Sequence, residues 1–294
     1  MASTSHATFD ARTSATEVAT AFSSSIRSRT ILITGVNKLG LGYAAASAFA
    51  SQNPKTIILA SRSSTKLEEC LEALSLEYPD TRFRELIVDL SSQRSVRRAA
   101  QTVLEWSDVP TIDTIINNAG VMMVPERTLS EDNIEMHLAT NHVGHCLLTN
   151  LLASKMIAAA KTSNAGTTRI VNVSSLATFV SGIRFSDIDW SRSSLDLPEK
   201  ERPNMALMKM SGLQVEEGQS YIPMAAYGSS KTANALFSVA LNKMIYRRHG
   251  ILSISLHPGE VASELQRYVA GTLCRRWTRL SKCLSLFYNT LEGS

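Results

Sequence analysis

The sequence predicts an α/β protein built on a single doubly wound, parallel β-sheet that is flanked by helices. Six short runs of aliphatic and β-branched residues recur along the chain, and a segment of helical length separates each run from the next. Runs that are apolar throughout are typical of parallel strands covered by helices on both faces. The chain has 294 residues, of which 44% are hydrophobic and 19% charged, a composition suited to one globular domain of this type.

The predicted strands lie in TILIT, TIILA, RELIVDL, DTIINNAG, RIVNVSS and ILSISLHPG. The helix-like stretches GYAAASAFASQ and STKLEECLEALSLEY follow the first two of them. Residues 1–28, rich in Ser, Thr and Ala, are predicted to form a peripheral arm. A short helix is expected to begin there after Ser14, because Ser14 and Glu17 have the spacing of a capping box. Residues 29–294 are predicted to form one Rossmann-type domain.

Composition and residue spacing disfavour several classes of function. The cysteines lack CxxC or Cys/His spacing, so neither a disulfide framework nor a zinc site is predicted. The HxxxxHxxH run from His137 to His145 has no cluster of acidic or cysteine partners, so its histidines are expected to be packed or solvated and no metal is predicted. A net charge of +4 does not favour nucleic acid as a partner. No transmembrane segment or secretory signal is recognised, and a cytoplasmic location is expected. Asp10 and Glu17 disfavour the alternative of a transit peptide.

The stretch TGVNKLGLG lies between the first predicted strand and the first long helix. Its glycines Gly35, Gly40 and Gly42 lead directly into that helix. A backbone without side chains can turn tightly and approach a pyrophosphate closely, and amide groups at the helix N-terminus can then meet the negative charge. The position of this loop favours a nucleotide-binding function.

The stretch AAYGSSKTANALF places Tyr227 and Lys231 four residues apart in an alanine-rich run that predicts a helix. Residues at this spacing lie on one helix face, one turn apart. An ammonium group there stabilises a phenolate and lowers the phenol pKa from its usual value of about 10. The pair is therefore a candidate general acid/base. The alternative is a solvated helix face, where this spacing is also common.

Further motifs occur in a fixed order along the chain: VDL with Asp89, NNAG at residues 117–120, NHVGH with Asn141, NVSS with Ser175, and HPG with Pro258 and Gly259. Together with the glycine loop and the Tyr/Lys pair, they resemble the short-chain dehydrogenases/reductases over residues 29–265. The glycine loop departs from the usual family pattern by one extra residue, and Leu39 stands where longer-loop relatives often have a glycine. This departure leaves the path of the loop open.

The resemblance implies a role for each matched residue. Tyr227 would be the general acid/base, and Lys231 would be its electrostatic partner and a ligand of the nicotinamide ribose. Ser175, rather than the adjacent Ser174, would hydrogen-bond the substrate oxygen, and Asn141 would hold a water that links Lys231 to solvent. The implied cofactor-binding residues are Gly35, Lys38, Gly40, Leu41, Gly42, Arg62, Asp89, Asn118, Ala119, Gly120, Tyr227, Lys231, Pro258, Gly259, Val261 and Ser263.

The end of the second strand indicates which cofactor is used. An acidic residue there is typical of NAD users, whereas an arginine suits the 2′-phosphate of NADP. The sequence is LASRSS, with Arg62 and no acid before Glu68, and Lys38 in the glycine loop supplies a second positive charge. NADP(H) is therefore predicted over NAD(H).

The segments outside the core motifs bear on the substrate. Ser175 and Tyr227 are separated by an insertion, residues 176–224, that resembles retinol-dehydrogenase-like members. Its methionine-rich NMALMKMSGLQ would either cover an apolar substrate or serve as packing. The whole chain resembles fungal members encoded beside secondary-metabolite pathways. Residues 261–294 are basic and apolar at helical spacing and lack a final strand signal. They would form a lid or a surface helix in contact with a membrane.

The function predicted is that of an NADP(H)-dependent oxidoreductase that interconverts an alcohol and a ketone or aldehyde on an apolar small molecule. A homo-oligomer is compatible with this function. The alternative is a catalytically impaired nucleotide-binding relative with a regulatory or binding role.

Overall fold

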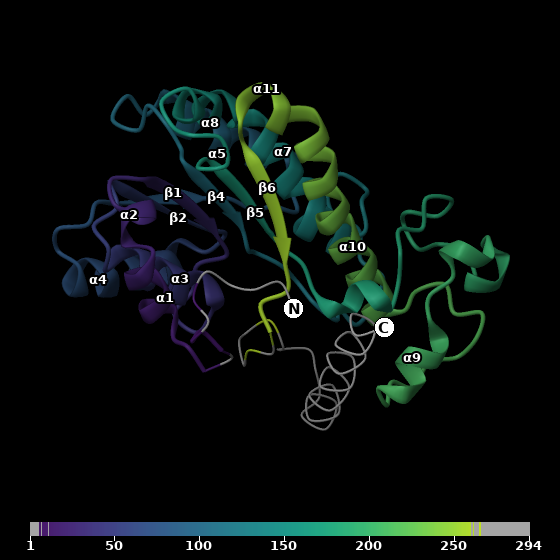
Figure 1. Cartoon of the computed structure of the whole chain (residues 1–294). Coiled ribbons are helices and arrows are strands. Elements are labelled where there is room, and N and C mark those ends of the chain that lie inside the picture. Colours follow the sequence, from purple (N-terminus) through teal and green to yellow (C-terminus); the bar gives the residue numbers. More distant parts are fainter. Residues whose placement is uncertain (1–5, 7, 11, 260, 262–264, 266–294) are drawn as a thin grey trace.

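A computed structural model describes residues 6, 8–10, 12–259, 261 and 265 of the chain. Six strands form one parallel sheet in the order β3-β2-β1-β4-β5-β6. The strands are β1 (Thr30–Thr34), β2 (Thr56–Ser61), β3 (Phe83–Ile87), β4 (Thr114–Asn117), β5 (Arg169–Val173) and β6 (Leu252–Leu256). The chain starts at the centre, winds outward to β3, and then crosses back to β4 beside β1 (Figure 1). The predicted doubly wound α/β fold is confirmed.

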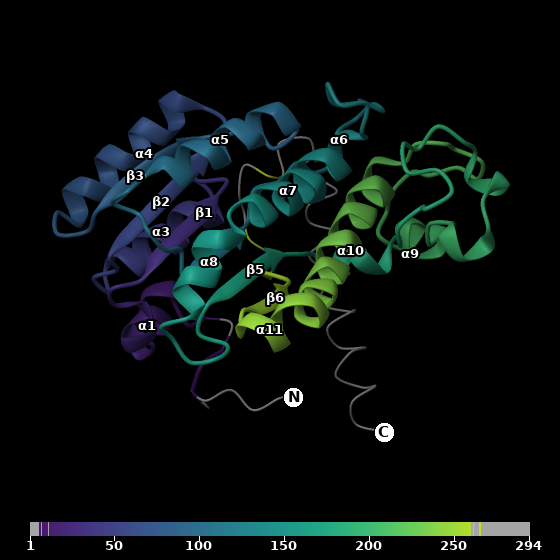
Figure 2. The same ribbon diagram turned by 90° about the horizontal axis from the view of Figure 1, so that it is seen from above.

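Helices connect the strands and cover the sheet (Figures 1 and 2). The α-helices are α1 (Ala15–Ala21), α2 (Ser23–Ile26), α3 (Leu41–Ala50), α4 (Ser64–Glu77), α5 (Gln93–Glu105), α6 (Met136–Leu138), α7 (Gly144–Leu151), α8 (Ala153–Ala160), α9 (Met205–Met210), α10 (Pro223–Leu241) and α11 (Arg247–His249). Shorter turns are π-helical at η1 (Ala139–Val143) and η5 (Asn242–Tyr246), and 3₁₀-helical at η2 (Leu176–Phe179), η3 (Ser194–Asp196) and η4 (Glu199–Glu201).

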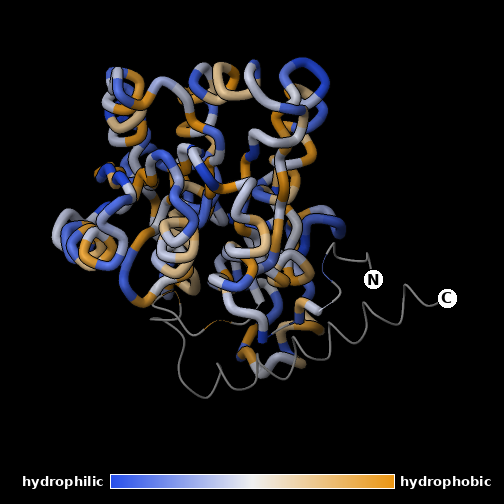
Figure 3. The backbone as a smooth tube through the Cα atoms, turned by 60° about the vertical axis from the view of Figure 1, so that its left-hand side comes forward, coloured by the Kyte–Doolittle hydropathy of each residue, from blue (hydrophilic) through white to orange (hydrophobic). Residues whose placement is uncertain are grey.

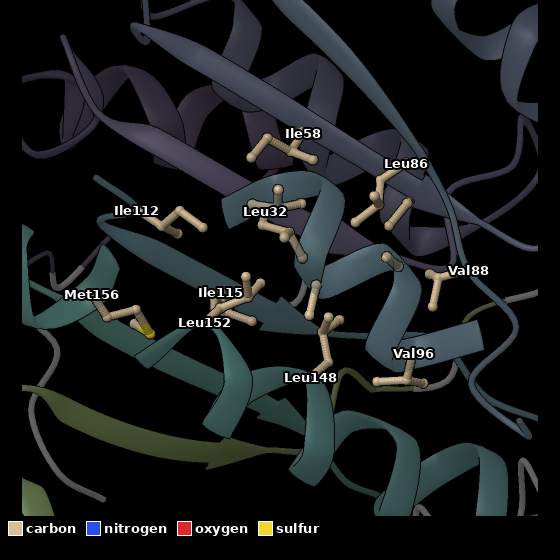
Figure 4. Packing of buried hydrophobic residues seen from close by; sticks show 14 of the residues in the cluster. Leu32, Ile58, Leu86, Val88, Val96, Ile112, Ile115, Leu148, Leu152 and Met156 are labelled. Atoms are coloured by element: carbon tan, nitrogen blue, oxygen red, sulfur yellow. The ribbon is translucent and has the colours of Figure 1, made fainter. Parts of the chain in front are cut away.

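Two hydrophobic clusters cover the two faces of the sheet. Leu32 of β1 belongs to one cluster, which includes Val96 of α5 and Leu148 of α7 (Figure 4). Its neighbours Ile31 and Ile33 belong to the other, which includes residues of α3 and α4. Successive side chains of a strand point to opposite faces, so a strand buried on both sides must be apolar throughout. Burial of each such side chain contributes about 1.5–3 kcal/mol. Figure 3 shows hydrophilic residues at many of the connecting turns.

The N-terminal segment packs against this domain. Helix α1 begins after Ser14 as predicted, with both hydrogen bonds of the capping box: Glu17 N–H donates to Ser14 Oγ, and Ser14 N–H donates to the Glu17 carboxylate. Ala19 and Ile26 are buried in the cluster that includes Ile31 and Ile33. The described part of the arm therefore contributes to the core.

The insertion at residues 176–224 projects beyond the N-terminal end of α10, away from the sheet (Figures 1 and 2). It forms a third cluster around Trp190, which is 2% exposed, together with Met208 and the first turn of α10. Arg184 and Asp187 form a buried ion pair beside this cluster, and the Arg184 guanidinium lies 4.1 Å from the Trp190 ring centroid. The insertion thus has a small core of its own.

Two expectations concern membranes and the C-terminus. In the described part of the chain, no single helix is long and apolar enough to cross a bilayer. Among the residues that the structure describes, the segments Met136–Leu151 and Ala153–Ala160 taken together, bent by 57°, reach the required length and hydropathy. The predicted lid or surface helix after Val261 falls almost entirely outside the described residues.

Candidate active site

A cavity of about 440 Å³ opens at the carboxyl ends of the strands. Residues that follow β1, β2, β3, β4, β5 and β6 all line it, as expected for a ligand site in a doubly wound sheet. The predicted residues that line it are Gly35, Gly40, Leu41, Arg62, Asp89, Asn118, Ala119, Gly120, Ser175, Tyr227, Lys231, Pro258, Gly259 and Val261. Lys38 is exposed and Gly42 and Asn141 are buried behind the wall, while Ser263 falls outside the described residues.

The glycine loop packs closely against the segment that follows β4 and is hydrogen-bonded to it. Gly35 has a φ of 73°, and a Cβ at this position would lie 2.6 Å from the Ala119 Cα. The side-chain amide of Asn118 donates through Nδ2 to the Thr34 backbone carbonyl at 2.7 Å. Only glycine allows both this conformation and this approach. The close contact between Gly35 and Ala119 therefore links the TG of the glycine loop to the NNAG motif.

The extra residue in the loop is accommodated by a turn. Gly40 N–H donates to the Asn37 carbonyl at 2.9 Å, and Leu39 is 70% exposed within this turn. A Cβ on Gly42 would lie 2.7 Å from the Gly35 carbonyl oxygen. The helix therefore still begins directly beneath the loop, and the residues suit close approach by a pyrophosphate.

Tyr227 and Ser175 meet at the opposite side of the cavity. Both residues line the cavity, and the Ser175 side chain lies close enough to the Tyr227 hydroxyl to lower its pKa. Ser174, in contrast, donates its hydroxyl to the Lys231 carbonyl at 2.7 Å and so ties β5 to α10. A Cβ on Gly228 would lie 2.4 Å from the Ala177 carbonyl oxygen. This glycine therefore lets α10 approach the segment after Ser175 closely.

Lys231 lies one helical turn after Tyr227, with its Nζ 5.7 Å from the Tyr227 ring centroid. The ammonium donates to the Val173 carbonyl at 2.9 Å. Burial raises the pKa of Tyr227 to about 12, against a smaller lowering by the neighbouring Ser175 side chain. Burial lowers the pKa of Lys231 to about 8. The burial of Tyr227 thus opposes the lowering of its pKa that the sequence predicts, and the phenol is protonated at neutral pH.

Asn141 lies in the π-helical turn η1 and connects three segments. Its Oδ1 accepts from Val121 N–H at 2.8 Å, and its Nδ2 donates to the Val121 carbonyl at 3.0 Å and to Ser230 Oγ at 2.9 Å. Both amide protons are therefore used within the protein. The backbone carbonyl of Asn141 accepts from His145 Nδ1 at 2.9 Å.

His145 connects the glycine-loop side of the site to the helix that carries Asn141. Its Nδ1 bonds the Asn141 carbonyl, so Nε2 is the acceptor for Thr34 Oγ1 at 2.8 Å. Thr34 Oγ1 in turn accepts from the backbone N–H groups of Asn118 and Ala119, both at 3.0 Å. Within the described residues, no group of three or more His, Cys, Asp or Glu side chains could hold a metal. This histidine is a structural bridge, which the sequence motifs did not predict.

The burial of His145 predicts an acid-dependent loss of stability. Burial lowers its pKa to about 3 from an ordinary value of 6.5. Below pH 6.5 the unfolded chain binds a proton that the folded chain does not, so the stabilising effect is complete above pH 6.5 and is lost as the pH falls toward 3. The free energy of unfolding should lose roughly 3 kcal/mol between pH 7 and pH 4 from this group alone.

Urea unfolding at both pH values tests this expectation. His145→Gln should reduce the pH-dependent loss by about that amount, whereas His249→Gln, on the partly exposed α11, should leave it unchanged. Equal pH dependence in the wild type and His145→Gln would contradict a buried neutral His145.

Sequence reasoning also missed part of the cavity wall at the end of β2. Ser61, Ser63 and Lys66 line the cavity beside Arg62. Ser63 is the N-cap of α4, and its Oγ accepts from Lys66 N–H at 3.4 Å. A serine directly before a helical pattern is a capping signal, so the sequence RSSTK could have indicated a helix N-terminus at this point.

Comparison with known proteins places the chain in a family. The family model described as short chain dehydrogenase matches residues 29–187, more than half of the chain. The chain belongs to the short-chain dehydrogenase family. The matched region includes the glycine loop, NNAG, Asn141 and Ser175.

Relatives of this short-chain dehydrogenase include a fungal protein and a retinol dehydrogenase. Oxidoreductase fscI of Fusarium equiseti is 40% identical over 251 residues, which cover 85% of this chain and 94% of that protein. Human retinol dehydrogenase 13 is 33% identical over 243 residues, which cover 83% of this chain but only 62% of that protein. The resemblance to the retinol-dehydrogenase-like branch and to fungal members is confirmed.

Solved structures support the fold of this short-chain dehydrogenase. The Pseudomonas aeruginosa RhlG/NADP active-site complex aligns with a TM-score of 0.57 and 21% identity, over 84% of this chain and 79% of that chain. An NADPH-bound carbonyl reductase from chicken fatty liver aligns with a TM-score of 0.54 and 22% identity, over 84% and 85% of the two chains. At these identities the likeness concerns the fold.

Proposed function

We propose that this chain is an NADP(H)-dependent oxidoreductase that interconverts an alcohol and a ketone or aldehyde on an apolar small molecule. The observation that carries the proposal is the meeting of Ser175, Tyr227 and Lys231 at the wall of the cavity that the glycine loop also lines. A role in secondary-metabolite biosynthesis is part of the proposal and rests on the resemblance to fungal members; the relative from Fusarium equiseti is named only as an oxidoreductase. The cytoplasmic location and the homo-oligomeric state stay predictions.

The residues present suit a bound dinucleotide. The glycine loop offers its backbone to the pyrophosphate, and the backbone of residues 118–120 lies beside it. Gly120 is close to the reactive groups, since a Cβ there would lie 3.7 Å from Lys231 Nζ. Lys231 would bind the ribose hydroxyls through its ammonium. When bound, the nicotinamide supplies or accepts the hydride.

Tyr227 and Ser175 would carry the proton chemistry. In the reducing direction, Ser175 hydrogen-bonds the carbonyl oxygen, and Tyr227 donates its phenolic proton as negative charge develops there. A phenol whose pKa is raised to about 12 by burial is fully protonated at neutral pH and is ready to act as an acid. In the oxidising direction the phenolate must form, and the Lys231 ammonium beside it stabilises this charge. The protonated phenol therefore suits the role of general acid in the reducing direction.

The cavity wall after β2 supports NADP(H) as the cofactor. Arg62 and Lys66 bring positive charge there, and Ser61 and Ser63 bring hydroxyl groups. These are the donors that a 2′-phosphate requires. Two solved structures with the same fold are described as bound to NADP or NADPH.

Calorimetric titration of the purified chain with NADPH and NADH tests the cofactor proposal. Arg62→Ala should weaken NADPH binding at least tenfold, which is about 1.4 kcal/mol, because a charge-assisted hydrogen bond to the phosphate is lost. NADH affinity should change less than twofold. Arg97→Ala, an exposed arginine on α5, is the matched control and should affect neither nucleotide.

Equal weakening of NADPH and NADH by Arg62→Ala would contradict a role in 2′-phosphate recognition. Absence of binding by the folded wild type would overturn the proposed function. Tight binding of NADPH without oxidation by any aldehyde or ketone would favour the alternative of a nucleotide-binding relative without turnover.

A further inference from the structure

Residues 121–124 follow the NNAG motif and form a short segment, here called the wall. Its first two residues, Val121 and Met122, line the cavity together with Ser175 and Tyr227. Met123 has a φ of 56°, in the left-handed region that a long side chain rarely adopts. A residue keeps such a conformation only where surrounding contacts hold it, and such residues are frequent at ligand sites.

Side chains from other segments hold both ends of this wall. Asn141 bonds both backbone polar groups of Val121, at 2.8 Å and 3.0 Å. At the other end, Val124 N–H donates to His137 Nε2 at 3.2 Å, and the Val124 carbonyl accepts from the Tyr221 hydroxyl at 2.8 Å. The conformation of the wall therefore depends on side-chain hydrogen bonds.

Glu135 determines which nitrogen of His137 is the acceptor. His137 Nδ1 lies 2.7 Å from Glu135 Oε1, and Glu135 Oε2 accepts from Leu138 N–H at 3.0 Å. Because Val124 N–H donates to Nε2, the ring proton is on Nδ1 and points to the carboxylate. Both side chains are fully buried. The His137 ring also packs edge-on against Tyr227, with centroids 6.1 Å apart, so one pair supports the wall and the candidate acid.

Tyr221 connects the wall to the insertion. Its ring packs edge-on against Trp190, with centroids 6.5 Å apart, and Trp190 lies under the Arg184 guanidinium. Burial, with a smaller contribution from Glu135, raises the pKa of Tyr221. Its hydroxyl therefore remains a donor to the Val124 carbonyl across the working pH range. The insertion therefore contacts the site in two ways: its ends line the cavity with Leu176, Ala177 and Met224, and Tyr221 holds the Val124 carbonyl. No residue of its methionine-rich helix α9 is among the residues that line the cavity.

The polarity of the cavity changes from one end to the other. Arg62, Lys66 and Asp89 lie near the ends of β2 and β3, where the nucleotide is expected. Around Ser175 and Tyr227 the lining is apolar, from Val121, Met122, Leu176, Ala177 and Met224. Two of these five residues belong to the wall, so its position sets the width of the apolar end.

We propose that Glu135, His137 and Tyr221 are positioning residues that hold residues 121–124 as a fixed wall and thereby set the selectivity of the site for bulky apolar carbonyl compounds over small ones. This inference rests on the proposed function. The three residues act through the backbone of Val124.

Two nearly isosteric variants test the inference. In Glu135→Gln, the side-chain oxygen stays with Leu138 N–H, so the amide NH₂ faces His137 Nδ1 and the ring proton moves to Nε2, where it opposes Val124 N–H. Tyr221→Phe removes only the hydroxyl.

Tyr78→Phe is the matched control, since its hydroxyl bonds Ser47 and Glu77 away from the cavity. NADPH oxidation is measured with propanal as the small aldehyde and naphthaldehyde as the bulky one.

The wild type should reduce the bulky aldehyde with a kcat/KM at least tenfold above that for propanal. Glu135→Gln and Tyr221→Phe should each lower this ratio at least fivefold, because the bulky aldehyde binds less well and its KM rises. The Kd of NADPH should stay within twofold of wild type. Nitrogen NMR of Glu135→Gln should show the His137 proton on Nε2 in place of Nδ1. Should Glu135→Gln fail to fold, Tyr221→Phe still decides the question.

An unchanged ratio in the folded variants, with both aldehydes reduced by the wild type, would overturn this inference alone. A wild type that binds NADPH but reduces neither aldehyde would overturn the proposed function and this inference together.

Discussion

Replacing Tyr227 by phenylalanine is expected to lower kcat by about 10²- to 10⁴-fold, the range that a positioned general acid contributes. The phenol is 4% exposed and lies beside Ser175 on the cavity wall, and phenylalanine leaves no group at this position that could donate a proton. Phenylalanine keeps the ring that packs against His137. The measurement is NADPH oxidation under saturating aldehyde, with calorimetric NADPH binding alongside.

The binding measurement distinguishes a loss of proton donation from a loss of NADPH binding. Tyr227→Phe should bind NADPH within a few-fold of wild type, because the proposed nucleotide contacts lie in the glycine loop, residues 118–120 and Lys231. Tyr246→Phe, a 41% exposed tyrosine, is the control and should retain full turnover. Full turnover in Tyr227→Phe would refute the assigned role of the phenol.

Gly228→Ala is expected to lower kcat by a similar factor. It removes no reacting group and acts by moving Tyr227 away from Ser175. The new Cβ would lie 2.4 Å from the oxygen and 3.3 Å from the carbon of the Ala177 carbonyl, and these backbone atoms cannot rotate away. Helix α10 and the turn after Ser175 must therefore separate. A displacement of about 1 Å at a reacting group can cost 10²-fold in rate, and the strain should lower the free energy of unfolding by about 1–3 kcal/mol.

Gly182→Ala is the matched control for this variant, because a Cβ at Gly182 would have no heavy atom within 4 Å. Turnover and urea unfolding are measured on both variants. We expect Gly182→Ala to behave as wild type. A Gly228→Ala variant with normal kcat would show that the close approach of α10 to Ala177 does not set the distance between Tyr227 and Ser175.

The strands and the glycine loop could be predicted because their signals are local. A parallel strand buried on both faces must be apolar, as in TILIT, and a helix start needs a cap, as at Ser14. The contact of Gly35 with Ala119 was not visible in the sequence, although both residues were assigned to the site.

The methionine-rich stretch of the insertion illustrates what the sequence left open. It was compatible with either a cover over the substrate or packing. Met208 is buried beside Trp190 and Met210 is 75% exposed, and neither lines the cavity. The methionines that line the cavity are Met122 and Met224, which come from segments without a methionine-rich pattern.

The sequence by itself determined the order of the strands and helices, the position of the glycine loop, and the spacing of Tyr227 and Lys231 on one helix. These features depend on residues that are neighbours in the chain. Only the tertiary structure decided that Ser175 meets Tyr227, that His145 bridges Thr34 and Asn141, and that Tyr221 holds Val124. Such contacts join residues up to 111 positions apart, and a hydrogen bond between distant segments depends on how the whole sheet and its helices pack.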